Sequence, residues 1–253
     1  MGAYRRSTGT RFWRLRDDTC SRLNDPEHVQ SRTDDSALGR FLARLLTRSA
    51  LTGDERAAIL NLRGHAVQVP AHRDIIAPGQ STESACLVVD GLVARFDQME
   101  DGMRQITSLY IAGDMCDLHS VVSPVAGWGL QAVATTTILR ILHAELRELA
   151  TKHPAIAFAF WRDTAVDASV LAKWVSNVGR RDARSRLAHL FCEMGVRSEQ
   201  AGIGSRSDFP LPMTQNQLGD ALGLTPVHVN RTMQGLRYDG LVATENRRIR
   251  VGR

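Results

Sequence analysis

Residues 214–231 read Thr-Gln-Asn-Gln-Leu-Gly-Asp-Ala-Leu-Gly-Leu-Thr-Pro-Val-His-Val-Asn-Arg, and no other segment of the chain is as informative. Thr214 and Gln217 have the spacing of a capping box, and Gly223 can end a helix in the left-handed conformation. Thr225 can cap a second helix that has Pro226 at its first position. The segment therefore predicts two short helices that meet across a glycine turn, as in a helix-turn-helix.

The second of these helices carries side chains that can read DNA bases. Its inward positions are Val229, Met233 and Leu236, and its outward positions are Val227, His228, Asn230 and Arg231. In a helix-turn-helix this recognition helix lies in the major groove and its first turns contact bases. There Arg231 can pair with guanine and Asn230 with adenine, while Val227 can contact a thymine methyl group but cannot accept from cytosine.

The residues around this segment add a small basic wing. Residues 241–243 and 248–251 alternate as strands around a turn at 244–247, whereas residues 202–212 read as a loop. From residue 206 to 253 there are seven arginines against four acidic residues. Charge, motif and context together predict DNA binding, and the candidate contacts are Thr214, Gln215, Thr225, Val227, His228, Asn230, Arg231, Arg237 and Arg247.

Two further helices are expected before the helix-turn-helix. One covers residues 182–198 and is capped by Asp182. The other is long, opens at His153-Pro154 and has apolar residues on more than one face. Such a helix usually lies between two surfaces, so we expect it to form a dimer interface with its copy, through Ile156, Phe160, Val170, Trp174 and Val178. The alternative is a helix that is buried within one chain.

The region before the long helix reads as a β-structure that follows two short helices. Apolar residues between Leu38 and Leu62 recur at steps of three and four, and Thr52 and Glu55 have the spacing of a capping box. From Ala66 to about Leu142, short β-branched runs alternate with turns at intervals of roughly ten residues, which is typical of a sandwich or jelly-roll barrel.

Length and composition limit the class of protein and its location. The 253 residues are 43% hydrophobic and 23% charged, which is typical of a globular chain with about two domains. No stretch has the roughly 20 apolar residues of a membrane span, and no secretory signal is visible, so we expect a cytoplasmic protein with no membrane partner. The net charge of +5 comes almost entirely from arginine. The four cysteines lack zinc or redox spacing, so unpaired thiols and no metal are expected.

The order of these features resembles the Crp/Fnr transcription regulators. The resemblance rests on Gly113-Asp114, on His153-Pro154 and on the run from Leu222 to Arg231, and covers about residues 38–253. It implies an α+β fold with an N-terminal β-barrel or jelly-roll sensor domain, a long dimerisation helix and a C-terminal winged helix-turn-helix domain. It also implies a homodimer on a two-fold symmetric double-stranded DNA site, with RNA polymerase as a further partner. The corresponding division is 1–35 as an extension, 36–152 as sensor, 153–181 as dimerisation helix and 182–253 as DNA-binding domain.

The sensor departs from the cyclic-nucleotide binders of that family. Their phosphate is held by a Gly-Glu-Leu segment and an Arg-Ser or Arg-Thr pair, but here Asp117 replaces the glutamate and the pair falls on Ala126-Gly127. A phosphate without a cation would be costly in that pocket. We therefore expect no tight cyclic AMP binding and no cofactor, and the candidate effector pocket consists of Gly113, Asp114, Asp117 and Leu171.

Two other classes of function are alternatives to a regulator. The first is a small-molecule sensor or protein-interaction module whose C-terminal helices do not read DNA. The second is an enzyme, and the sequence has no Ser-His-Asp order, zinc spacing or phosphate-binding glycine loop that would support it. The prediction is therefore a regulator that is not an enzyme.

Overall fold

The structure is a computed structural model that describes residues 37–252. The predicted extension, residues 1–35, lies outside the described residues. A helix runs through residues 37–46 and is followed by α2 (Gly53–Leu60). The predicted capping box of α2 is confirmed, because the Thr52 hydroxyl accepts from the Glu55 backbone and the Glu55 carboxylate accepts from the Thr52 backbone.

Seven strands and a short 3-10 helix form the N-terminal domain. They are β1 (His65–Val69), β2 (Asp74–Ile76), β3 (Ser84–Asp90), β4 (Val93–Gln98), β5 (Arg104–Tyr110), η1 (Leu118–Val121), β6 (Gly129–Ala132) and β7 (Thr136–Leu142). One antiparallel sheet has the order β1-β7-β3 and the other the order β2-β6-β4-β5. The sequence predicted a barrel or jelly roll, and the described strands form two facing sheets of a roll that does not close into a continuous barrel.

The interior of the roll is apolar on both walls. Val88 and Ile138 of the first sheet pack in one buried cluster with Val93, Tyr110 and Leu130 of the second. Alternate residues of β4 point the other way, out of the roll, where Ala94 and Phe96 join a second cluster. This alternation is the two-residue period of a strand that is covered on both faces.

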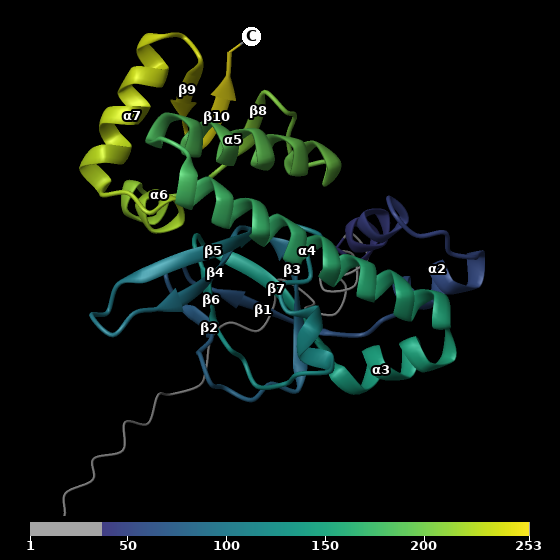
Figure 1. Ribbon diagram of the computed structural model, residues 1–253. Helices are drawn as coiled ribbons and strands as arrows, with labels where there is room; N and C mark the ends of the chain where they lie inside the picture. The colour runs from purple at the N-terminus through teal and green to yellow at the C-terminus, as the bar shows by residue number, and fades with distance from the viewer. Residues whose placement is uncertain (1–36, 253) are drawn as a thin grey trace, which may run out of the picture.

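Helix α4 (Pro154–Arg180) follows α3 (His143–Lys152) and crosses in front of the sheets toward the C-terminal domain (Figure 1). Its predicted start at His153-Pro154 is confirmed, since Pro154 occupies the first helical position. Pro has no backbone N–H, and at this position of a helix that group would have no partner. Helix α3 was not predicted from the sequence.

The C-terminal domain contains α5 (Ala183–Gln200), β8 (Asp208–Pro210), α6 (Gln215–Leu222), α7 (Pro226–Tyr238), β9 (Val242–Glu245) and β10 (Arg248–Val251). The predicted caps at Asp182, Thr214 and Thr225 are confirmed, and so is the left-handed Gly223 with φ of 62°. The loop expected over residues 202–212 was wrong in one part, because β8 forms there and pairs with β10. The wing is therefore a three-stranded sheet.

The two domains share one apolar cluster. It joins the outer face of the four-stranded sheet, including Phe96 and Leu109, to Trp174 of α4 and to Leu190 and Leu218 of the C-terminal domain. No helix within residues 37–252 is long and apolar enough to cross a membrane.

Candidate DNA interface and sensor sites

Helices α6 and α7 are held in a fixed relation around the glycine turn. The Gln215 side chain amide donates to the Asn230 side chain oxygen at 3.2 Å. Arg186 of α5 donates to the backbone oxygens of Leu222 and Gly223, at 2.9 and 3.3 Å. These oxygens are among the carbonyls that the end of α6 leaves without helical partners, so the arginine stabilises the turn between the two helices.

The outer face of α7 is open to solvent. Val227 is 79% exposed, Arg231 and Gln234 are also exposed, and Val229 and Met233 are buried on the opposite face. Residues 227, 231 and 234 lie on one side of the helix because they are separated by about one turn each. Asn230 is half-buried, and its side chain oxygen can still accept a second hydrogen bond besides that from Gln215.

The remaining predicted DNA contacts lie around α7. Thr214 and Gln215 are exposed at the start of α6, and Thr225 is exposed and His228 half-buried at the start of α7. Arg237 donates to Thr244 of the wing, and Arg247 is exposed in the turn between β9 and β10 with φ of 59°. Two residues near this surface, Gln234 and Arg186, were not predicted from the sequence. Helical spacing from Val227 and Arg231 identifies Gln234, whereas Arg186 lies on another helix.

Three carboxylates of the C-terminal domain are paired with arginines. Asp239 pairs with Arg184, Glu245 with Arg250, and Asp208 with Arg248. Within residues 37–252, neither Arg231 nor Arg247 has a carboxylate partner at ion-pair distance. Their guanidinium groups are therefore available to phosphates or base edges.

The predicted effector residues do not come together in one pocket. Gly113 and Asp114 line a cavity of about 110 Å³ between the helix at 37–46, α4 and α5, and Asp117 lines a separate cavity of about 10 Å³ inside the roll. Leu171 is half-buried on α4 and lines neither. Gly113 is pressed against the neighbouring helix, because a Cβ on it would lie 2.6 Å from the Arg40 Cβ.

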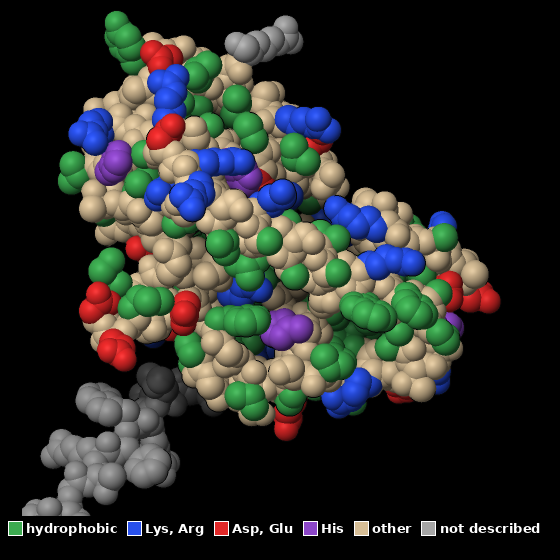
Figure 2. All heavy atoms as spheres, viewed as in Figure 1, with side chains coloured by type: hydrophobic (Ala, Val, Ile, Leu, Met, Phe, Trp, Pro, Cys, Tyr) green, Lys and Arg blue, Asp and Glu red, His purple; other side chains and the backbone are tan. Residues whose placement is uncertain are grey.

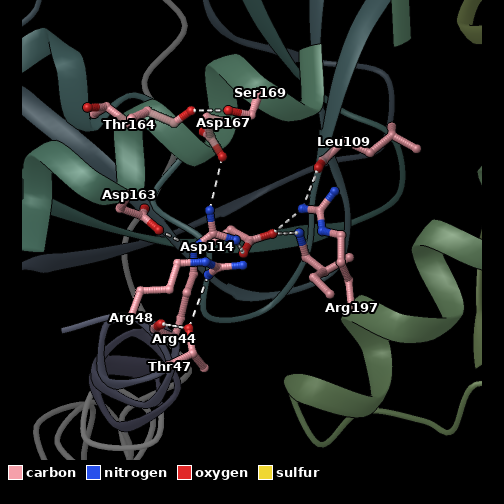
Figure 3. A network of polar contacts seen from close by, with 12 residues as sticks. Arg44, Thr47, Arg48, Leu109, Asp114, Asp163, Thr164, Asp167, Ser169 and Arg197 are labelled. Atoms are coloured by element: carbon pink, nitrogen blue, oxygen red, sulfur yellow. Dashed lines mark hydrogen bonds and ion pairs between the residues drawn. The ribbon is translucent and has the colours of Figure 1, made fainter. Parts of the chain in front are cut away.

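The Asp114 carboxylate takes part in an ion-pair network (Figure 3). Its two oxygens accept from Arg44 at 2.7 Å and from Arg197 at 2.6 Å, and Arg44 also pairs with Asp163 and Asp167. Burial opposes ionisation of Asp114, but the two arginines outweigh it and hold the pKa of Asp114 below its usual value. Burial raises the pKa of Asp167 to about 6, because Arg44 offsets only part of it. The network ties the sensor turn to α4 and α5, and both carboxylate oxygens of Asp114 are already paired with arginines.

The interior of the roll is closed by an arginine stacked on aromatic rings. The Arg95 guanidinium lies 4.9 Å from the centre of the Trp128 ring and 6.0 Å from that of Tyr110, and its Nε donates to Thr107 at 3.2 Å. The His119 ring packs on Trp128 at 5.1 Å. Burial raises the pKa of Asp117 to about 6. The remaining cavity of about 10 Å³ has room for about one water.

Helix α4 turns only part of its apolar surface toward its own chain. Of the residues predicted to form a dimer interface, Ile156, Phe160 and Trp174 are buried within the chain, and Val170 and Val178 are half-buried. The face that α4 leaves exposed is a different one. It carries Phe158, Trp161, Ala165, Ala168, Ala172 and Val175, at alternating steps of three and four, and is here called the α4 seam.

The cysteines in the described part of the chain are free thiols. Cys86 and Cys116 are buried and Cys192 is exposed, while Cys20 lies outside that part. Between residues 37 and 252 no group of three His, Cys, Asp or Glu side chains is placed to hold a metal ion.

Comparisons with known proteins agree with this architecture. Residues 185–252 match the family model of the Crp-like helix-turn-helix domain. The transcriptional activator protein FnrL of Cereibacter sphaeroides is 27% identical over 188 residues, which cover 70% of this chain and 72% of FnrL. The nitrogen fixation regulation protein FixK of Azorhizobium caulinodans is 25% identical, with coverages of 69% and 70%. The solved structure of FixK2 from Bradyrhizobium japonicum has a TM-score of 0.69 at 25% identity, and covers 76% of this chain and 94% of that one.

A β-roll, a long helix and a winged helix-turn-helix with an open recognition helix together define a class of DNA-binding transcription regulators. Within that class, the chain belongs to the Crp/Fnr family. Regulators of this family bind DNA and act as dimers, and the relatives found are transcription regulators rather than enzymes. The predicted family, fold class and general function are thereby confirmed.

Proposed function

We propose that the chain binds a two-fold symmetric promoter site through α7, with Val227, Asn230 and Arg231 at the bases. The observation that carries this proposal is the exposed face of α7, on which Arg231 has no carboxylate partner within residues 37–252. Thr214, Gln215 and Thr225 lie where a backbone phosphate would approach the helix starts, and Arg237 and Arg247 extend the surface onto the wing. Arginine side chains also lie over the C-terminal domain in Figure 2.

Charge reversal on α7 tests this proposal. A guanidinium that reads a base contributes about 1–3 kcal/mol, so Arg231→Glu should weaken binding to the selected site at least tenfold. The site itself comes from sequencing genomic fragments that the purified protein retains without added ligand. Arg63→Glu, an exposed arginine of the sensor domain, makes the same charge change away from α7 and should leave affinity nearly unchanged. Equal affinity of Arg231→Glu and the parent protein would refute base reading by α7.

We further propose that the protein is a homodimer that pairs through the α4 seam. Phe158 is 54% exposed, Trp161 69% and Val175 66%, and the aromatic rings of Phe158 and Trp161 stack on each other at 6.1 Å. Alternating steps of three and four are the spacing by which two helices pack along their length. Two copies would then present two α7 helices to half-sites about one DNA turn apart, roughly 34–36 Å.

A carboxylate in the seam tests the dimer. Val175→Glu would bury two like charges against each other, and we expect it to give monomers in sedimentation at concentrations where the parent protein is dimeric. Lys173→Glu changes an exposed residue of the same helix that lies off the seam, and it should remain dimeric. A dimeric Val175→Glu variant would exclude the seam as the interface.

The sensor, in our proposal, does not take cyclic AMP. Neither Ala126 nor Gly127 carries a charge to pair with a phosphate, and Trp128 with Arg95 fills the interior. Calorimetry with cyclic AMP should give no binding heat, and the nucleotide should not alter DNA affinity.

We also propose that the protein acts in the cytoplasm. The proposed domains are the sensor at residues 36–152, the dimerisation helix at 153–181 and the DNA-binding domain at 182–253. RNA polymerase is a further candidate partner. In vitro transcription from a selected promoter tests this partnership, since an effect on transcript yield that does not depend on blocking the start site would indicate contact with the polymerase.

A further inference from the structure

An open apolar cavity lies outside the roll, where η1, α3 and α4 meet. Its volume is about 530 Å³, and its walls include Leu118, Val121, Leu146, Ala157, Phe160 and Trp161. Pockets that bind small molecules typically measure about 300–1,000 Å³ and are lined mainly by apolar and aromatic side chains. The groove, as we call this cavity, therefore has the size and lining of a ligand site.

One cation stands at the edge of the groove. Arg147 of α3 lines it and donates through Nη1 to the Val121 backbone oxygen at 3.1 Å. No carboxylate of the described residues lies at ion-pair distance from Arg147, and its Nη2 makes no hydrogen bond within that part of the chain. A guanidinium with a free edge beside an apolar wall matches a ligand that has an apolar body and a carboxylate head.

The interior of the roll offers far less space than the groove. Its cavity measures about 10 Å³, because Trp128 and Arg95 fill it. His119 lines both cavities and packs on Trp128. A ligand in the groove would thus contact the side chain that covers the interior.

The groove also reaches the proposed dimer interface. Trp161 belongs both to its wall and to the α4 seam, and Figure 2 shows hydrophobic side chains gathered over the same part of α4. We propose that the groove binds a small amphipathic carboxylate, with its apolar body against Phe160 and Trp161 and its carboxylate on Arg147. Occupancy would then alter the packing of the seam. Only this last consequence rests on the proposed function, since binding itself needs neither DNA nor a dimer.

The test uses the full chain without DNA, with decanoate as the probe and decanol as its uncharged counterpart. We expect decanoate to bind in calorimetry at least tenfold more tightly than decanol. Arg147→Gln should lower the affinity for decanoate about tenfold and leave decanol unchanged, because a charge-assisted pair typically contributes about that factor. Lys152→Gln, five residues further along α3 and paired with Glu148, is the matched control and should bind both probes as the parent does.

A second variant tests the apolar wall. Ala157→Phe should block both probes while the circular dichroism and melting temperature of the protein stay close to those of the parent. Three outcomes would overturn the proposal: no binding of decanoate to the parent, equal binding of decanoate to Arg147→Gln, or unchanged binding to a folded Ala157→Phe. If Ala157→Phe instead weakens dimerisation and the parent binds no probe, the groove is a contact between copies. Failure of DNA binding alone would leave these measurements unaffected.

Discussion

At the scale of single residues, Asp117 shows how a buried charge opposes folding. Its Oδ1 accepts from the Cys86 backbone N–H at 2.6 Å, and its Oδ2 has no hydrogen-bond partner within residues 37–252. Burial raises the pKa of Asp117 to about 6, whereas in an unfolded chain the value is about 3.9. The native state therefore binds more protons than the unfolded state between these values, and the free energy of unfolding falls as pH rises from about 4 to about 6.

We expect Asp117→Asn to remove this contribution. The free energy of unfolding of the variant, relative to the parent, should rise by about 2 kcal/mol between pH 4 and pH 7, because the two pKa values differ by about two units and the unfolded carboxyl is already half ionised at pH 4. Urea unfolding at a series of pH values measures it. Asp90→Asn, at the exposed end of β3, should show no such rise. A constant difference between Asp117→Asn and the parent would mean that Asp117 does not titrate in this range.

For Asp114 we expect the opposite effect, a loss of stability when it is replaced, because its carboxylate is paired with two arginines. Asp114→Asn leaves Arg44 and Arg197 near each other with one negative charge fewer between them. Breaking a buried ion pair from one side costs about 3–5 kcal/mol, and the lower end applies because Asp163, Asp167 and Glu193 remain. Urea unfolding at pH 7 gives this loss directly. Asp239→Asn, which breaks an exposed pair with Arg184, should cost at most about 1 kcal/mol.

At the scale of elements, the turn between α6 and α7 depends on a glycine. Gly223 has φ of 62°, and a Cβ there would lie 3.0 Å from Val178 Cγ1. Gly223→Ala should therefore lower the free energy of unfolding by about 1–2 kcal/mol and weaken DNA binding. Gly235→Ala is the matched control, since apart from neighbouring backbone of α7 itself no atom lies within 4 Å of its Cβ position. Alanine there should stabilise the protein by up to about 1 kcal/mol, and equal effects of the two variants would contradict the role of the turn.

The elements that the sequence predicted are those with local signals. The caps at Thr52, Asp182, Thr214 and Thr225 act within three residues of themselves, so a single sequence displays them. Strand β8 was missed because it has three residues and is defined by a partner far along the chain, β10. Short strands carry too few residues to show a two-residue alternation.

The same distinction applies to the candidate sites. The proposed base-reading face of α7 lies within one helix, so its spacing could be predicted from the sequence. The Arg44, Asp114 and Arg197 network joins residues 70 and 83 positions apart, and no local pattern predicts it. The apolar residues of α4 were recognised, but their division between the chain's own core and the exposed seam required knowledge of which face the roll covers.

At the scale of the whole molecule, the two domains share a core. Phe96 and Leu109 of the sensor sheet belong to the same buried cluster as Leu190, Leu218 and Trp174. The Gln105 side chain also donates to the Asp220 backbone oxygen at 2.6 Å, and Arg197 of α5 pairs with Asp114. Unfolding either domain alone would expose the apolar face that it buries against the other, at roughly 25 cal/mol per Å². We therefore expect one cooperative unfolding transition.

Two variants that each retain one described tryptophan can test this expectation. Trp128 reports on the roll, and Trp174, whose indole N–H donates to Glu193 at 2.7 Å, reports on the junction of α4 with α5. In each variant the other three tryptophans are replaced by phenylalanine, and urea unfolding is followed at one protein concentration by fluorescence and by far-UV circular dichroism. The fluorescence midpoint and slope should equal those from circular dichroism in both variants, so that a difference in overall stability between the variants does not affect the comparison. Adding Asp114→Asn should lower both midpoints together, because the network belongs to both domains. A Trp174 transition at lower urea than that of Trp128 would mean that the C-terminal domain unfolds independently, and the shared core would then contribute little to coupling sensor and DNA-binding domain.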